Sequence, residues 1–377
     1  SHHLEKWEHL IGFQENPYPY IKNADLFVCS SLNEGYNLES ISRGRNNNLN
    51  LIRFIAALMV ILGHSYVATT AGKEHEFMCI ITQNQLDFGG LAVSIFFVYG
   101  GFLICKSMHR LENAKYYFKA RIIRIFPPLI FVTFVMAFIV GPIVTELSID
   151  SYFTSVGTYK YLLNSFMILV HDLPGVFLEN MQTAVNGPLW TLPVEFLCYI
   201  ACYIMYKMGL LDKKNAKYTV IPVVVIYIIS YKILGVVPLL REALRPAVLF
   251  YVGMLYYVYR EDIVIDLKGV LICSVLAMIS VPLHIMRITI FLFLPYLMMA
   301  LGYGTKRKIA DFGKKAEISY GIYLFGWPAQ QCIVKYFGVS MSAIHNFILA
   351  SVIAILCGFI TYYLIEQPMA KWSKGKS

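Results

Sequence analysis

The chain has 377 residues, of which 58% are hydrophobic and 15% are charged, and its formal net charge is +9. Soluble globular domains carry about 25% charged residues, so this composition excludes a water-soluble globule, a disordered chain and a collagen-like rod. The apolar residues form long uncharged runs, such as 129–144 and 347–360, and several apolar blocks reach the ~20 residues that cross a bilayer. The composition therefore predicts an all-α integral membrane protein.

The first 45 residues differ in composition from the rest of the chain. They mix charges, Pro and Gly with one short apolar run, Leu26–Cys29, which is typical of a buried strand. A cleavable signal peptide is not expected in so polar a segment. We expect a short soluble α/β-like fragment over 1–45, a multi-span membrane domain over 46–370 and a basic tail over 371–377.

Ten apolar blocks between residues 49 and 364 predict ten membrane-spanning helices. The long loop after the third block holds a short apolar stretch, 161–170, which we expect to be interfacial or re-entrant. The ninth block contains two glycines and a proline, so a kinked or closely packed helix is expected there. The predicted spans are 49–67, 88–106, 124–144, 189–208, 218–236, 243–259, 265–283, 287–303, 318–337 and 343–364.

The basic residues predict an orientation for these spans. If the amino terminus is cytoplasmic, 22 of the 32 Lys and Arg lie on the inner side and seven on the outer side. This bias follows the positive-inside rule and predicts a multi-pass protein of the cytoplasmic membrane with both termini cytoplasmic. Since the positive charge follows topology, no nucleic-acid partner is expected. The eight cysteines lie mostly inside apolar blocks, so neither a disulfide framework nor a metal site is expected.

The first span carries two ionisable residues, Arg53 and His64. Such residues are costly inside a membrane and indicate function by default. Eleven residues apart, they share one helix face with an offset of about 20° and lie about 16 Å apart along the axis. This places Arg53 near the predicted cytoplasmic end and His64 in the outer third of the membrane. The alternatives are a snorkelling Arg53 and a hydrogen-bonded packing role for His64.

The fourth predicted span enters from the outside and carries Trp190, Glu195 and Tyr199. Glu195 lies about six residues, or ~9 Å, below the outer boundary, which is a depth similar to that of His64. We expect the two to pair, because a carboxylate that orients a histidine prepares it to take a proton from a hydroxyl. Glu195 could instead serve packing alone, and Trp190 and Tyr199 could be interfacial aromatics.

The loop after the second span is the most basic part of the chain and ends in Arg121 and Arg124, three residues apart at a helix start. Guanidinium groups suit phosphate oxygens, although positive-inside topology alone would also explain them. The glycine pairs at 89–90 and 100–101 are expected to be helix-packing positions.

Ten spans with buried ionisable residues also describe a transporter or a flippase of a lipid-linked sugar. Inverted repeats would favour that function, and no convincing internal repeat links the two halves of the sequence.

Five motifs in order over residues 46–370 resemble the acyltransferase-3 family of integral-membrane O-acyltransferases. The first is Asn48 to Ser65, with an Arg and a His separated by ten residues, and the second is Val93 to Leu103, where Gly100 replaces the usual Ser. The paired arginines, the segment from Leu189 to Glu195, and Ile318 to Leu324 complete the set. A His that often follows the last motif is Gly326 here.

The resemblance implies transfer of an acyl group, usually acetyl, from cytoplasmic acyl-CoA to a carbohydrate hydroxyl on the far side. It implies that His64 is the catalytic base, that Glu195 is its partner or a second acid/base group, and that Arg53, Arg121 and Arg124 contact the donor. No metal is implied. The expected partners are acyl-CoA as donor, a carbohydrate acceptor and the lipid bilayer.

The segments Ile11–Tyr18, Ala24–Val28 and Ser30–Gly35 are similar to a strand–loop piece of family-4 retaining glycosyltransferases. In that family Glu34 begins a pair of glutamates eight residues apart, but the partner position here is Ser42. A fragment this small cannot enclose a nucleotide sugar, so glycosyltransferase activity is not expected.

Overall fold

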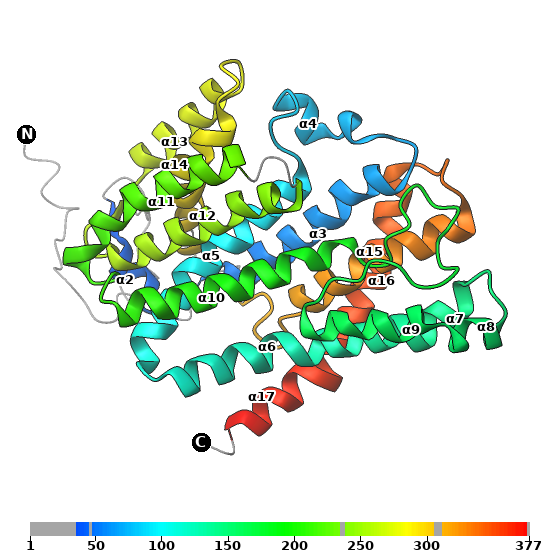
Figure 1. Cartoon of the computed structure of the whole chain (residues 1–377). Coiled ribbons are helices and arrows are strands. Elements are labelled where there is room, and N and C mark those ends of the chain that lie inside the picture. The colour runs from blue at the N-terminus through cyan, green and yellow to red at the C-terminus, as the bar shows by residue number, and fades with distance from the viewer. Residues whose placement is uncertain (1–34, 45–46, 234–237, 305–310, 375–377) are drawn as a thin grey trace, which may run out of the picture.

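The computed structural model describes residues 35–44, 47–233, 238–304 and 311–374. Helices dominate, and they lie side by side as a bundle (Figure 1). The long helices are α3 (Leu49–Ala68), α5 (Phe88–Leu111), α6 (Ala114–Val135), α10 (Thr191–Lys207), α11 (Lys213–Ile233), α12 (Pro238–Val258), α13 (Leu267–Ser280), α14 (Met286–Met299), α15 (Ser319–Phe337) and α16 (Ala343–Thr361). The short ones are α2 (Leu38–Ser42), α4 (Phe77–Ile81), α7 (Gly141–Val144), α8 (Ile149–Thr154), α9 (Val156–Lys160) and α17 (Gln367–Lys374).

Each of the ten predicted spans overlaps one of these long helices. Six helical segments in the described parts of the chain are long and apolar enough to cross a membrane, which supports an integral membrane protein. They are Leu49–Ala68, Phe88–Leu111, Ala114–Val144, Gly187–Lys207, Met286–Gly304 and Ala343–Ser373. The full count of ten crossings and the position of both termini stay predictions.

Local sequence explains where several helices begin. The side chains of Asp87, Asn113 and Asp266 each accept a hydrogen bond from a backbone N–H of the first turn of α5, α6 and α13. This capping satisfies donors that the helix itself leaves free. α6 continues through a π-helical turn, Met136–Val140, into α7, so one long segment runs from Ala114 to Val144.

Glycines allow the central helices to approach closely. A Cβ atom added to Gly101 of α5 would lie 1.9 Å from the carbonyl oxygen of Phe250 in α12, and one added to Gly253 of α12 would lie 2.2 Å from that of Val98. The expected packing role of the glycine pair at 100–101 is therefore confirmed for Gly101. The expectation of close packing for α15 is confirmed as well, since a Cβ on Gly321 would lie 2.8 Å from the Cα of Gly358 in α16.

The long loop 145–188 contains α8, α9 and a 3₁₀ helix, Tyr161–Phe166, and it packs through buried aromatic residues against α6 (Figure 1). Its last part packs along the middle of α15, where Trp327 Nε1 donates to the carbonyl oxygen of Ala184 at 2.7 Å. The short apolar stretch is thus a helical turn packed on protein. Whether it touches lipid stays a prediction.

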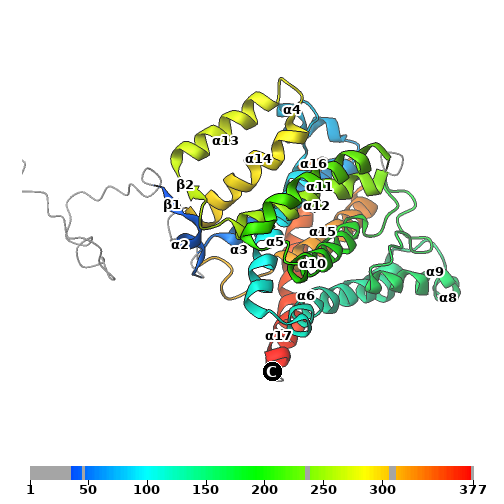
Figure 2. The ribbon, with the colours of Figure 1, turned by 60° about the vertical axis from the view of Figure 1, so that its left-hand side comes forward.

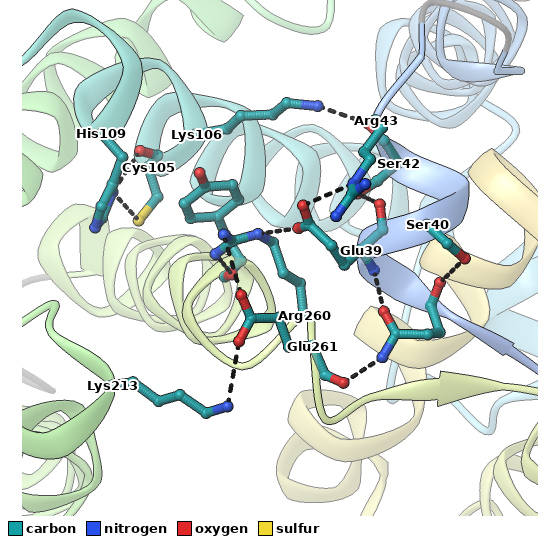
Figure 3. A network of polar contacts seen from close by, with 12 residues as sticks. Glu39, Ser40, Ser42, Arg43, Cys105, Lys106, His109, Lys213, Arg260 and Glu261 are labelled. Carbon is teal, nitrogen blue, oxygen red and sulfur yellow. Dashed lines mark hydrogen bonds and ion pairs between the residues drawn. The ribbon is translucent and has the colours of Figure 1, made fainter.

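Residues 36–44 pack against the opposite end of the bundle, next to α13 and α14 (Figure 2). Strand β1 (Tyr36–Asn37) pairs antiparallel with β2 (Val264–Ile265), and the side chain of Leu38 is completely buried. Glu39 forms an ion pair with Arg260, and Lys106 Nζ donates to the Ser42 carbonyl oxygen at 2.6 Å (Figure 3). The described part of the amino-terminal segment therefore packs against the helical bundle. The predicted strand Leu26–Cys29 lies outside the described residues.

Candidate active site

A cavity of about 270 Å³ lies between α3, α5, α6, α10 and α15, and it brings together all three arginines that the sequence singled out. Arg53 comes from α3, and Arg121 and Arg124 come from α6. We call it the inner cavity, because these residues lie at the predicted cytoplasmic side. Its lining comprises Arg53, Val93, Phe96, Phe97, Gly100, Leu103, Ile104, Arg121, Arg124, Ile125, Thr191, Leu192, Glu195, Tyr199, Ser319, Tyr320 and Tyr323.

The three guanidinium groups are only partly neutralised. Arg124 Nη2 pairs with Glu317 Oε2 at 3.0 Å, while Arg121 Nη2 donates to Ser107 Oγ at 3.0 Å. Arg121 Nε is buried without a hydrogen-bond partner among the described residues. A buried donor without a partner is rare in proteins and calls for a ligand or water. The inner cavity therefore offers cationic donors to an anionic group.

Glu317 is a residue of this site that the sequence reasoning missed. It directly precedes α15, and its other carboxylate oxygen accepts from the Ser319 hydroxyl. Although burial alone would raise it, the charges of Arg124 and Arg53 hold the pKa of Glu317 at about 2. Its position next to the motif that begins at Ile318 is the available signal, but Glu317 precedes the predicted span 318–337 and reads there as an ordinary charged residue of a polar loop.

Glu195 lines the inner cavity, and the hydroxyl of Tyr199, one helical turn further along α10, donates a hydrogen bond to its Oε1. The i, i+4 spacing places both side chains on one face of the helix. Trp190, by contrast, lines a different cavity. The three residues that the sequence singled out in the fourth span thus divide between two sites.

A second cavity of about 160 Å³ contains His64, and we call it the histidine cavity. The His64 ring lies edge-on to Trp327, with ring centroids 5.2 Å apart, and its Nδ1 is buried without a partner among the described residues. The lining comprises Val60, Gly63, His64, Val67, Lys73, Glu76, Asp87, Gly89, Gly90, Val93, Pro188, Trp190, Thr191, Glu242, Arg245, Pro246 and Tyr323.

Two acidic residues of the histidine cavity, Glu76 and Asp87, come from the loop after α3. Asp87 Oδ2 pairs with Lys73 Nζ at 2.5 Å, and its Oδ1 accepts from the backbone N–H of Gly90. Burial works against it, but the Lys73 ammonium lowers the pKa of Asp87 below its usual value. Glu76 is completely buried, and its Oε1 accepts from the backbone N–H of Phe88. Here burial dominates and raises the pKa of Glu76.

The structure does not bring His64 and Glu195 together. Each lines a different cavity, and the hydrogen bond that Glu195 accepts comes from Tyr199. The expected pairing of His64 with Glu195 is not found, because the two side chains lie at different depths in the bundle. Trp190 and Thr191 are the residues of that segment beside His64, and Glu195 lies about one helical turn, or ~6 Å, further towards the arginines.

The two cavities adjoin each other in the middle of the bundle. Val93, Thr191 and Tyr323 line both of them, and the hydroxyls of Thr191 and Tyr323 are hydrogen-bonded at 2.5 Å. Arg53 and His64, on the same face of α3, therefore point into two neighbouring spaces. A small group that entered beside the arginines would need to pass only this shared wall to reach the imidazole.

The two positions at which the sequence departs from the family pattern have different surroundings. A Cβ on Gly100 would make ordinary contacts of 3.4 Å with the Phe250 ring, so there is room for a small side chain such as Ser. A Cβ on Gly326 would lie 2.8 Å from Ile61 Cγ1. The close contact between α15 and α3 thus leaves no space for a histidine at this position.

The polar residues of the loop after α3, Lys73, Glu76 and Asp87, were also missed by the sequence reasoning, as was Arg245 at the start of α12. Asp directly before an apolar helix is a recognisable capping pattern, but it does not reveal a neighbouring histidine. No group of three or more His, Cys, Asp or Glu side chains in the described residues has the arrangement of a metal site.

Comparisons with known proteins identify the family. An "Acyltransferase domain" family model matches residues 46–363. The O-acetyl transferase of Shigella phage Sf6 is 25% identical over 346 residues, which cover 88% of this chain and 98% of that protein. Nodulation protein 10 of Rhizobium leguminosarum bv. viciae is 26% identical over 168 residues, 42% of this chain and 44% of that protein.

No solved structure matches the chain significantly. The glycosyltransferase resemblance of the first 40 residues is not shown by these comparisons and stays an expectation. The family match covers most of the chain and spans both cavities. The chain therefore belongs to the acyltransferase-3 family and is a membrane-bound O-acyltransferase.

Proposed function

We propose that the protein moves an acetyl group from cytoplasmic acetyl-CoA to a hydroxyl of a cell-surface carbohydrate, such as a capsule, O-antigen or exopolysaccharide, across the cytoplasmic membrane. The observation that carries this proposal is the pair of adjoining cavities, one with three arginines and the other with His64. The phage relative is an O-acetyl transferase by name, which supports acetyl as the group transferred.

The donor binds at the inner cavity. Arg53, Arg121 and Arg124 offer guanidinium donors to the phosphate groups of CoA, for which planar bidentate groups are well suited. Glu317 holds Arg124 in place through its ion pair. Glu195, held by Tyr199, lines the same cavity from α10 and orients the donor's thioester arm rather than pairing with His64.

The chemistry occurs at the wall that the two cavities share. His64 takes the proton of the acceptor hydroxyl as general base, and the hydroxyl oxygen attacks the carbonyl carbon of the thioester. The carbon–sulfur bond breaks, and the imidazolium returns its proton to the departing thiolate. The products are the O-acetyl ester and the CoA thiol. Trp190, which lines the histidine cavity, presents an aromatic face to the acceptor.

Sealed membrane vesicles of known orientation test this proposal. Acetyl-CoA does not cross membranes, so inverted vesicles, whose cytoplasmic face is outward, should incorporate radiolabelled acetyl groups into polysaccharide, and right-side-out vesicles should not. Vesicles that lack the protein provide the background. Incorporation no higher than this background with abundant protein, or incorporation by right-side-out vesicles alone, would refute the proposal.

A further inference from the structure

A third cavity, of about 700 Å³, opens beyond the histidine cavity, and we call it the outer cavity. Its walls come from the loop after α3, the end of α11, the start of α12 and the turn between α13 and α14. All four segments lie on the predicted outer side. The volume falls within the ~300–1,000 Å³ of pockets that enclose ligands of drug size, which is roughly the size of a short oligosaccharide.

The outer cavity and the histidine cavity are continuous. Lys73, Asp87, Glu242 and Arg245 line both. Their charges are of both signs, and Lys73 and Asp87 neutralise each other in a 2.5 Å ion pair. A wall of this kind suits a ligand rich in hydroxyl groups better than a strongly anionic or cationic one, because neither sign of charge prevails.

Arg245 is a polar residue at this boundary with unused hydrogen-bonding capacity. It forms no hydrogen bond or ion pair with the described residues, and its Nε is buried without a partner. A Cβ atom added to Gly90 would lie 2.6 Å from Arg245 Nη2. The glycine at this position therefore makes room for the guanidinium group. Lys73, by comparison, is already engaged by Asp87.

Two further polar atoms in the histidine cavity are also buried without a hydrogen-bond partner among the described residues. Glu76 is completely buried, and while its Oε1 accepts from Phe88, its Oε2 has no partner among the described residues. His64 Nδ1 is the other. Native proteins leave few buried polar atoms unsatisfied. Three of them around one cavity of about 160 Å³ indicate a polar ligand there.

We propose that the outer cavity binds a neutral oligosaccharide segment of the acceptor, and that Arg245 and Glu76 hold the sugar ring that enters the histidine cavity. Arg245 donates to ring or hydroxyl oxygens, Glu76 accepts from a hydroxyl, and a further hydroxyl is presented to His64. This inference rests on the proposed function and specifies its acceptor. It requires a chain of several sugars, since a single ring would leave the outer cavity empty.

Acceptor kinetics with the full-length protein in lipid nanodiscs test this. The probes are fragments of one to four sugars cut from the host's surface polysaccharide after alkaline removal of its ester groups, with radiolabelled acetyl-CoA as donor. The acceptor KM should fall at least tenfold from one sugar to three. Arg245→Ala should raise the KM of the trisaccharide about tenfold or more, the cost of losing a hydrogen bond to a charged group. Its KM for acetyl-CoA should stay within twofold.

Arg43→Ala is the matched control, because Arg43 is an exposed arginine at the other end of the bundle. Arg245→Gln, which keeps the stem and one donor group, serves if the alanine variant does not fold, and it should give a smaller rise in acceptor KM. Equal KM values for all fragment lengths, or an unchanged trisaccharide KM in a folded Arg245 variant, would overturn this inference while the wild type still transfers. A wild type that transfers no acetyl group to any fragment would instead refute the proposed function, and the acceptor assignment with it.

Discussion

The crossing of α5 and α12 gives the sharpest structural prediction. Gly101→Ala adds one methyl group that would lie 1.9 Å from the Phe250 carbonyl oxygen and 3.0 Å from the Met254 nitrogen. Both are backbone atoms, which cannot rotate out of the way as a side chain can. To restore an ordinary contact of 3.4 Å, the helices must separate by about 1.5 Å, the difference between 3.4 and 1.9 Å.

Overpacking of this kind costs about 1–3 kcal/mol. At about 2–4 °C per kcal/mol for a chain of a few hundred residues, the melting temperature should fall by roughly 2–12 °C. Gly100→Ala is the matched control, since its Cβ would meet the Phe250 ring at 3.4 Å. There the higher helix propensity of Ala, worth up to ~1 kcal/mol over Gly, should leave stability unchanged or raised.

The assay is thermal unfolding of both variants and the wild type in one detergent, followed by acetyl transfer in nanodiscs. Because α5 and α12 contribute walls to the histidine cavity, Gly101→Ala should also lose transfer activity. Equal melting temperatures for Gly101→Ala and Gly100→Ala would refute the reasoning, because it would mean that the close helix contact does not exist.

Two other substitutions test the two ends of the site. Arg121→Ala should raise the KM for acetyl-CoA about tenfold or more, because a charged hydrogen bond is lost; initial rates at varied acetyl-CoA measure it, and an unchanged KM would contradict the donor assignment. Glu76→Gln tests how the burial of the Glu76 carboxyl group affects stability at different pH values. Because burial raises the pKa of Glu76, the folded state is disfavoured as pH rises above the unfolded value of 4.5. The variant should therefore melt like the wild type at pH 4.5 and at a higher temperature at pH 8, whereas a difference that does not vary with pH would argue against it.

The helices and the common helix face of Arg53 and His64 could be predicted from the sequence. Long apolar runs specify membrane helices because a helix satisfies its backbone hydrogen bonds within a single segment, which lipid requires. The eleven-residue spacing of Arg53 and His64 places both on one face of α3, and the two cavities lie against that face. Such features depend only on the periodicity of one helix.

Contacts between segments far apart in the chain could not be predicted. The predicted depth of Glu195 depends on the outer boundary of its span, and that of His64 depends on the inner boundary of the first span. An error of one helical turn at either boundary therefore predicts a pair that the structure does not contain. The pairing of β1 with β2 involves only two residues on each strand, too few to give a sequence pattern. Arg245 falls inside the predicted span 243–259 and Glu76 in the polar loop before the second span, and the composition of neither segment indicates that the two side chains meet at one cavity.

The most direct test of the central claim is proton NMR of surface polysaccharide. Wild type and His64→Ala are expressed in a strain without its own polysaccharide O-acetylation, their membrane levels are matched, and ester acetyl groups on the extracted polysaccharide are counted. The account predicts acetyl signals with the wild type and none with His64→Ala. Acetylation by the His64→Ala protein at the wild-type level would contradict it.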